Sequence, residues 1–198
     1  MMKKRSAKLR RKTRETDVAV EICLDGKGDY KINTGLAFLD HMFELFSRHS
    51  LIDLKIAAKG DLKVDYHHTV EDIGLALGEV LNKALGTRAG IARYGWGLVP
   101  MDEALSQVVI DLGGRPFLAF KMATRKTKIL DFDLSLIEEL FRAFCVQGRM
   151  NLHICQMYGK EPHHAYESVF KALGKALRMA SSPDARLKGK LPSTKGKI

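Results

Sequence analysis

Three features are scarce or absent in this 198-residue chain: paired cysteines, long apolar runs, and acidic residues near its two ends. The three cysteines form no CxxC motif, which argues against a disulfide framework or a zinc ribbon and favours a reducing compartment. No apolar run approaches the ~20 residues of a membrane-spanning helix, and no secretory signal pattern follows the basic N-terminus. We therefore expect a cytoplasmic protein without a membrane partner.

Because neither end of the chain contains an acid, positive charge is concentrated at both ends. Residues 1–14 hold eight lysines or arginines and residues 186–198 hold five, both without an acid. Removing these 13 from the 33 basic residues leaves 20 against 23 acids, so the stretch between them carries a charge of about −3. A nucleic-acid-binding domain usually carries its basic stripe on the folded body, so no nucleic-acid partner is expected. We interpret the ends as solvated, although nucleic-acid binding through them, or contact of some cations with a small phosphorylated ligand, stays open.

Hydrophobic spacing predicts the same order of elements twice, with no Pro/Gly/Ser-rich spacer between. In the first half we expect strands at 18–22, 30–33, 51–57 and 62–66, and helices over 38–46 and from His67 to a stop at Gly86. In the second half we expect extended segments at 91–98, 105–112, 116–122 and 150–157, and helices over 134–146 and 163–179.

A direct alignment supports an internal repeat. HHTVEDIGLALGEVLNKAL (67–85) aligns without a gap with HHAYESVFKALGKALRMAS (163–181), and eight of the nineteen positions are identical. We expect one α+β domain over 1–198, made of tandem pseudo-symmetric halves at about 15–90 and 91–182. Each half would hold a small sheet and two helices, with a basic N-terminal arm before them and a tail at about 186–198 after them.

The repeated HHxxE motif suits metal binding. Residues i and i+4 share one face of a helix, whereas neighbouring residues diverge by roughly 100°. Two adjacent histidines therefore serve two different ions more easily than one. Imidazole and carboxylate ligands without a thiolate suit Mn²⁺ or Fe²⁺ at least as well as Zn²⁺. A single HHxxE is more often a surface feature, and it is the second copy that favours a metal site. His41 and His153 are either further ligands or satisfied core histidines.

Several motifs together resemble one enzyme family. FLDHM, DYHHTVEDIG, ARYGWGLVPMDEAL, DLGGRPF, HHAYESVFKALGKAL and PSTKG occur here in the same order as in imidazoleglycerol-phosphate dehydratases, across nearly the whole chain. The resemblance implies a hydro-lyase of histidine biosynthesis that converts D-erythro-imidazole glycerol phosphate to imidazole acetol phosphate. It implies two Mn²⁺ ions that bind the substrate imidazolate, and a helical bundle between two four-stranded sheets. It also implies a homo-oligomer of 24 subunits with active sites shared between subunits.

The resemblance also implies roles for particular residues. The metal ligands would be His41, His67, His68, Glu71, His153, His163, His164 and Glu167. Catalytic roles would fall to Glu15, Glu71, Asp102 and Glu167, and substrate or phosphate contacts to Glu15, His49, Arg93, Arg115, Lys171, Ser193 and Lys195. Because Lys171 follows Glu167 by one helical turn, the metal and phosphate sites are expected to be neighbours. The tail is expected to order over the phosphate.

Plainer explanations stay open for some of these residues. Glu15 could be an exposed acid at a strand end, His49 could interact with a helix C-terminal dipole, and Lys171 could form an i,i+4 ion pair with Glu167. A dinuclear metallohydrolase acting on a phosphorylated small molecule would use the same metal ligands, and it is the main alternative from another enzyme class.

Overall fold

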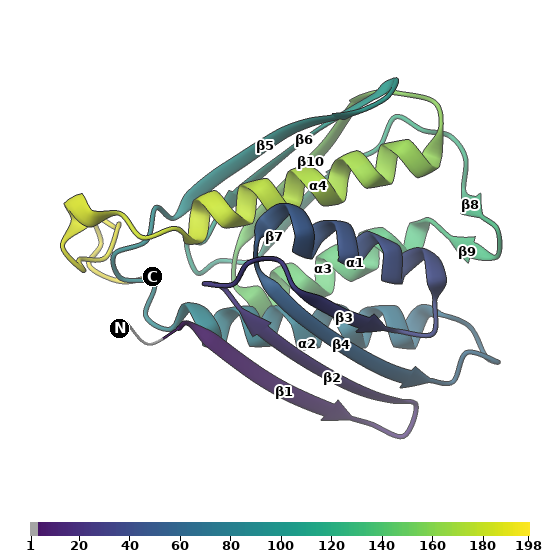
Figure 1. The fold of residues 1–198 in the computed structure, drawn as a ribbon, viewed down its shortest axis with the longest axis horizontal. Coiled ribbons are helices and arrows are strands. Elements are labelled where there is room, and N and C mark those ends of the chain that lie inside the picture. Colours follow the sequence, from purple (N-terminus) through teal and green to yellow (C-terminus); the bar gives the residue numbers. More distant parts are fainter. Residues whose placement is uncertain (1–3) are drawn as a thin grey trace.

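The computed structural model describes residues 4–198, in which four helices are packed between two four-stranded sheets (Figure 1). The first three residues of the basic N-terminal arm lie outside the described residues. The first half comprises β1 (Ser6–Lys12), β2 (Thr16–Cys23), β3 (Tyr30–Asn33), α1 (Ala37–Ser50), β4 (Asp53–Gly60) and α2 (His67–Leu85). The second half comprises β5 (Tyr94–Met101), β6 (Ala104–Asp111), β7 (Phe117–Lys121), α3 (Ser135–Gly148), β10 (Asn151–Tyr158) and α4 (Pro162–Ser181). Short strands β8 (Lys128–Ile129) and β9 (Phe132–Asp133) precede α3, and a 3-10 helix, η1 (Ala185–Leu187), follows α4.

The two sheets have the same topology and register, which confirms the pseudo-symmetric halves. Their strand orders are β1-β2-β4-β3 and β5-β6-β10-β7, and in each only the last pair is parallel. Across the first sheet Ser6 pairs with Cys23, which pairs with Asp53. Across the second, Tyr94 pairs with Asp111, which pairs with Asn151. From this edge the strand positions of the two halves correspond, up to a register shift between Gln156 and Tyr158 that occurs in β10 alone.

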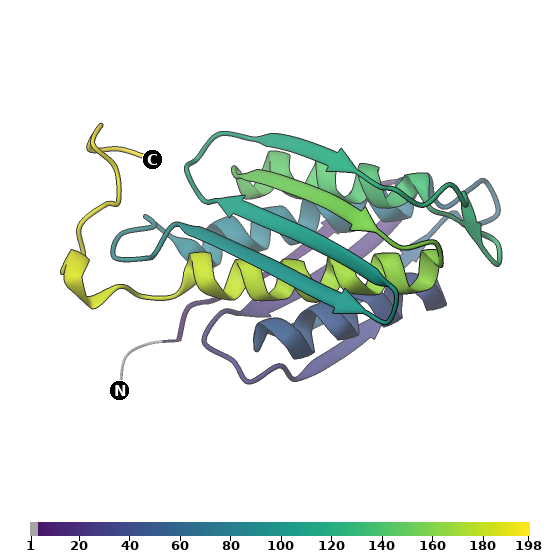
Figure 2. The ribbon, with the colours of Figure 1, turned by 90° about the horizontal axis from the view of Figure 1, so that it is seen from above.

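The core lies on both faces of the helical layer. Alternation in β2 buries Val18, Val20 and Ile22 against the helices, as a half-buried strand requires. Helices α1 and α2 cover the first sheet and α3 and α4 the second, while α2 packs on α3 and α1 on α4. Seen from above, the second sheet lies across its helices (Figure 2). The α2–α3 contact is close because α2 carries glycine there: a Cβ on Gly78 would lie 2.6 Å from the Phe144 carbonyl oxygen.

All four helices run in one direction, so their starts and finishes gather at opposite ends of the molecule (Figure 1). At the end where the helices start, the rings of Phe38, Tyr66, Phe132 and His163 make a chain of contacts. We call this the histidine end. At the other end, buried Arg88 donates to the carbonyls of Leu112, Gly148 and Arg149. We call this the arginine end. No helix within residues 4–198 is long and apolar enough to cross a membrane.

Two expectations about local structure were wrong. Residues 62–66 form a turn before α2 rather than a strand. Their apolar alternation is misleading because Val64 is largely exposed and no strand of residues 4–198 lies beside it. Most of the basic N-terminal arm is not a solvated end, since residues 6–12 form β1 along β2. Only Ala7 and Leu9 of β1 pack against the core, so its cations on the outer face hide the strand pattern.

Candidate active site

One compact group of metal-ligating side chains forms at the histidine end. His41 comes from α1, and His163 and Glu167 lie one turn apart on α4, which starts at Pro162. The Nε2 atoms of His41 and His163 lie 3.0 and 3.1 Å from Glu167 Oε1. Among residues 4–198 these three form the group whose ligand atoms all lie within 4.8 Å of one another. Two imidazole nitrogens and a carboxylate are donors that suit Mn²⁺, so the residues present fit such an ion.

Glu167 is buried and held as an anion. Burial alone would raise its pKa, but hydrogen bonds from Lys171 and His41 outweigh burial and bring the pKa to about 2. Lys171 Nζ lies 2.6 Å from Glu167 Oε2, so Lys171 forms the i,i+4 ion pair that its spacing allowed. A carboxylate with so low a pKa is a weak base, which favours ligation over proton transfer for Glu167.

The histidine pair of α2 has its own carboxylates. His68 Nδ1 lies 3.0 Å from Asp61 Oδ2 and 3.8 Å from Glu15 Oε2, while His67 Nε2 lies 3.9 Å from Glu71 Oε2. The hydrogen bond with Asp61 raises the pKa of His68. Because Asp61 binds Nδ1, the Nε2 atom of His68 stays available for a metal ion. Metal-binding histidines are commonly oriented in this way by a carboxylate on their other ring nitrogen. The other oxygen of Asp61 is buried without a hydrogen-bond partner among the described residues.

The second pair repeats this arrangement at His164. Its Nδ1 atom lies 2.7 Å from Glu103 Oε2, and its Nε2 atom lies 3.7 Å from Asp102 Oδ2. The hydrogen bond between His164 and Glu103 raises the pKa of His164 and lowers that of Glu103 to about 2. Asp102 and Glu103 lie in the turn between the first two strands of their half, as Glu15 does in the other. Sequence reasoning missed Asp61 and Glu103 as partners; the only signal for Glu103 was its place beside Asp102 in the MDEA motif.

The two histidine pairs share an end of the molecule but not a single site. Between them stand aromatic rings, with centroid separations of 6.4 Å for Tyr66–Phe132, 5.3 Å for Phe38–Phe132 and 5.9 Å for Phe38–His163. His67, His68 and Glu71 are therefore separate from the group around Glu167 within one chain.

Four of the residues expected to contact the substrate or its phosphate, Arg93, Arg115, Ser193 and Lys195, gather at the arginine end. A cavity of about 500 Å³ is lined by cations and by the folded tail: Arg93, Arg115, Arg149, Ser193, Lys195 and Lys197. Arg93 is held by Asp111, with Nε 2.7 Å from Oδ1, and its Nη1 donates to the Pro192 carbonyl at 2.7 Å. The C-terminal tail therefore folds against Arg93, beside which it was expected to contact the phosphate. Fixed cations around a cavity suit a phosphate group.

Within one chain Lys171 lies beside the metal-ligating group, as its spacing predicts, whereas the other expected phosphate contacts lie far from that group. The Arg93 amide donates to the carbonyl of Ala180 at the finish of α4, whereas His163 lies at its start. Seventeen residues at 1.5 Å each separate these positions by about 25 Å. His153 also lies apart from the other expected ligands. It is exposed on the outer face of β10, against Phe117 and close to Asn151, whose side chain contacts Arg115.

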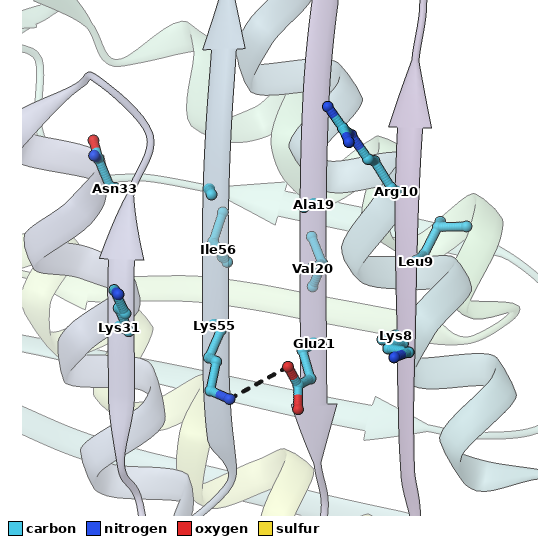
Figure 3. A pocket seen from close by; sticks show the side chains of 11 residues that line it. Lys8, Leu9, Arg10, Ala19, Val20, Glu21, Lys31, Asn33, Lys55 and Ile56 are labelled. Carbon is cyan, nitrogen blue, oxygen red and sulfur yellow. Dashed lines mark hydrogen bonds and ion pairs between the residues drawn. The ribbon is translucent and has the colours of Figure 1, made fainter.

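Two further observations complete the placement of the predicted residues. His49 is half-buried at the finish of α1, where burial first, and then the charges of Lys171 and Lys175, lower its pKa. A hollow of about 700 Å³ lies on the outer face of the first sheet and contains none of the predicted site residues (Figure 3). It is lined instead by strand residues such as Lys8, Arg10 and Lys55.

Comparisons with known proteins agree on one family. Residues 34–177 match the family model for imidazoleglycerol-phosphate dehydratase. The chain is 51% identical over 194 residues to the enzyme of that name from Nitrobacter hamburgensis, covering 98% of both chains. It is 52% identical to that from Nitrosomonas eutropha, covering 97% of this chain and 98% of the other. The crystal structure of the Staphylococcus aureus dehydratase superposes with a TM-score of 0.81 at 37% identity, covering 90% of this chain and 99% of that one. That of the Pyrococcus furiosus protein in complex with (S)-C348 has a TM-score of 0.82 at 36% identity, covering 96% and 100%.

Proposed function

This chain belongs to the imidazoleglycerol-phosphate dehydratase family, and from that premise we propose that it dehydrates imidazole glycerol phosphate at a two-Mn²⁺ site shared between copies of the chain. Family membership makes it a hydro-lyase of histidine biosynthesis. The proposal adds the metal ions, the residues that hold them and the shared site. It also includes a cytoplasmic location and assembly into a homo-oligomer, with 24 subunits as the expected size.

The observation that carries the proposal is the group of His41, His163 and Glu167, with its matching donors on α2. This group offers two imidazoles and a carboxylate at mutual ligand distance. The resemblance of the motifs adds His67, His68, Glu71, His153 and His164 to the ligand set. When bound, the ions would supply Lewis acidity and a template that holds the substrate ring. Asp61 and Glu103 would fix the rings of His68 and His164 through their Nδ1 atoms.

The distance between the histidine end and the arginine end implies that the active site is shared between copies of the chain. Only three carbons and an oxygen join the ring of the substrate to its phosphorus atom, whereas about 25 Å of helix separates the histidine end from the arginine end. One chain therefore cannot hold the ring at one end and the phosphate at the other. We propose that the arginine end of one copy, with His153, meets the histidine end of another, which is typical of a heterologous contact in a closed assembly.

Different carboxylates of the chain would then act as proton carriers and as metal ligands. Dehydration breaks the C–O bond next to the ring and the C–H bond of the following carbon, giving an enol that tautomerises to the ketone. Glu15 and Asp102 are the carboxylates free to move protons, since their side chains are 55% and 70% exposed beside the second histidine of each pair. Glu71 and Glu167 would act as ligands, although Glu71 is close enough to His67 to assist in proton transfer.

At the other end, cations fix the substrate by its phosphate. Arg93 is already oriented by Asp111, and Arg115, Ser193 and Lys195 line the same cavity. Charge-assisted hydrogen bonds from such groups orient the substrate without taking part in bond breaking. Lys171 lies instead beside Glu167, and His49 lies near Lys171 and Lys175 further along α4, where they would contact the middle of the substrate.

The test is turnover by Mn²⁺-loaded, assembled protein. Imidazole glycerol phosphate should give imidazole acetol phosphate, with the phosphate ester intact. A metallohydrolase would instead release inorganic phosphate, so one reaction mixture analysed for both products separates the two activities. Absence of the ketone product from a metal-loaded, assembled sample would contradict the proposal.

A further inference from the structure

The duplication gives the arginine end of the second half an equivalent in the first. Arg5 and Arg93 each directly precede the first strand of their half. The carbonyl of Arg5 accepts a hydrogen bond from the Leu24 amide at 2.9 Å, and that of Arg93 accepts one from the Leu112 amide at 3.0 Å. The paired strands keep the same register, since Cys23 pairs with Asp53 as Asp111 pairs with Asn151. The two regions are therefore equivalent residue by residue.

The first half keeps the cations of the phosphate pocket. The loops that follow the second strand are LDGKG in the first half, from Leu24, and LGGRP in the second, from Leu112. This alignment places Lys27 at the position of Arg115, just as Arg5 occupies the position of Arg93. Two of the positively charged positions that line the cavity in the second half are thus also positively charged in the first.

The first half differs by two added acids. Asp25 stands at the position of Gly113, and Arg5 binds it through Nη2 at 2.6 Å and Nε at 3.1 Å. Asp53 stands at the position of Asn151, and its Oδ1 accepts the loop amides of Lys27, Gly28 and Asp29 at 2.8, 3.1 and 3.1 Å. A carboxylate oxygen bound by three successive amides occupies the place that an external anion would take in such a loop.

Both acids are stabilised in their charged forms. The hydrogen bond with Arg5 lowers the pKa of Asp25. Burial opposes the charged form of Asp53, but the loop amides outweigh burial and lower its pKa. The outer face of the first sheet also differs from that of the second, because Lys55 occupies the position of His153. Lys55 pairs there with Glu21 at 3.3 Å (Figure 3).

The second half is open at the same positions. Gly113 has no side chain, and a Cβ there would lie 2.8 Å from Arg93 Nη2, so an acid like Asp25 has no room beside the Arg93–Asp111 pair. The Asn151 side chain is uncharged and donates to the Arg115 carbonyl at 2.6 Å. Gly113 and Arg115 line the cavity of about 500 Å³, and Asn151 adjoins it through its contact with Arg115.

We propose that Gly113 and Asn151 are the residues that admit phosphate to the second half, and that Asp25 and Asp53 close the equivalent loop of the first half with the protein's own carboxylates. This inference rests on the phosphate pocket of the proposed function. It explains why a chain with two histidine pairs would hold one phosphate rather than two.

The test measures inorganic phosphate binding to the Mn²⁺-loaded assembly by titration calorimetry. Wild type should bind one phosphate per chain at the arginine end, and Asn151→Asp should weaken that binding at least tenfold, because a carboxylate then faces the anion. Asn151→Ser is the matched control, since it removes the amide without adding charge and should keep binding within a few-fold. Manganese content, measured on each variant, must stay equal to that of wild type, because Asn151 lies two residues from His153.

The reciprocal variant tests the first half. Asp25→Gly with Asp53→Asn should add a second phosphate per chain, and adding Lys27→Ala should remove it again. Folding of each variant is checked by its thermal transition, and Asp53→Asn alone, with a weaker second site, serves if the double variant does not fold. Absence of any second phosphate in folded variants overturns the role of the two acids.

Arg115→Ala separates this inference from the proposed function. Loss of phosphate binding in Arg115→Ala together with unchanged binding in Asn151→Asp overturns the inference and leaves the pocket intact. Phosphate binding that neither substitution alters overturns both.

Discussion

His41 and Glu167 are 126 residues apart in the sequence, yet His41 Nε2 lies 3.0 Å from Glu167 Oε1. His41 belongs to the first half and Glu167 to the second, so this contact forms only when α1 packs on α4. The ligand group therefore depends on the packing of the two halves against each other, and neither half contains it alone.

The first prediction concerns this contact. Glu167→Gln removes the charge that His41, His163 and Lys171 share, so we expect at least about tenfold weaker Mn²⁺ binding at one of two sites, the scale at which changes around metal ligands act. Metal analysis after dialysis against buffered Mn²⁺ measures the effect. Glu161→Gln is the control, because Glu161 is a half-exposed acid that pairs with Lys126 rather than with a histidine. Two full equivalents of metal in Glu167→Gln would show that the ligand set is wrong.

The second prediction concerns acid stability. Asp53 has a lower pKa in the folded state than the ~3.9 of an unfolded chain, so the unfolded state binds its proton first as pH falls. Its contribution is present above about pH 4 and is lost as pH falls through the folded pKa. We expect the free energy of unfolding to fall less steeply between pH 5 and pH 3 in Asp53→Asn than in wild type, as measured by urea denaturation of metal-free protein.

Asp29→Asn is the control for that measurement. The Asp29 carboxylate is 62% exposed and pairs with an exposed Lys27 ammonium, so it should contribute little. Parallel slopes for wild type and Asp53→Asn would contradict the role assigned to the three loop amides.

The third prediction concerns the helical layer. Alanine is favoured over glycine in a helix by about 1 kcal/mol, so intrinsic propensity alone predicts that Gly78→Ala stabilises α2. The new Cβ would meet the Phe144 carbonyl oxygen at 2.6 Å, and overpacking costs about 1–3 kcal/mol. We therefore expect a net loss of about 1 kcal/mol in the free energy of unfolding. Glu79→Ala, at the next and more exposed position, should change it by less; a stabilised Gly78→Ala would mean that α2 and α3 lie further apart.

The fourth prediction concerns the tail. Deleting residues 193–198 removes Ser193 and Lys195 from the cavity at the arginine end. Each lost charge-assisted hydrogen bond to phosphate is worth about 1.5–3 kcal/mol, so KM should rise at least tenfold. The melting temperature should change little, because these residues add nothing to the buried core. An unchanged KM would show that the tail does not reach the substrate.

Much of the fold could be predicted from the sequence. The alternation of Val18, Val20 and Ile22 and the helical spacing after His67 locate β2 and α2, because one face of each is buried in the core. The alignment of the two HHxxE segments predicts the duplication, which the matching sheet orders confirm. Strand β1 was missed because only its Ala7 and Leu9 pack against the core, and a cationic edge strand gives little hydrophobic signal.

The site was less predictable, for a physical reason. Spacing along one helix places His163, Glu167 and Lys171 together, but it does not reveal that Asp61 or Glu103 engages a histidine ring, because these contacts cross between elements. The same limit applies to Arg93 and Lys171, both expected near phosphate. The topology places Arg93 beside the end of α4, whereas Lys171 lies nearer its start.

The most direct test is complementation between copies. Glu167→Gln impairs the histidine end and Arg115→Ala the arginine end, so each variant alone should have little dehydratase activity. Disassembled by metal removal, mixed in equal amounts and reassembled with Mn²⁺, they should recover about a quarter of wild-type turnover, because each site then draws its two ends from independently chosen copies. Turnover no greater than the sum of the separately reassembled variants would contradict a site shared between chains.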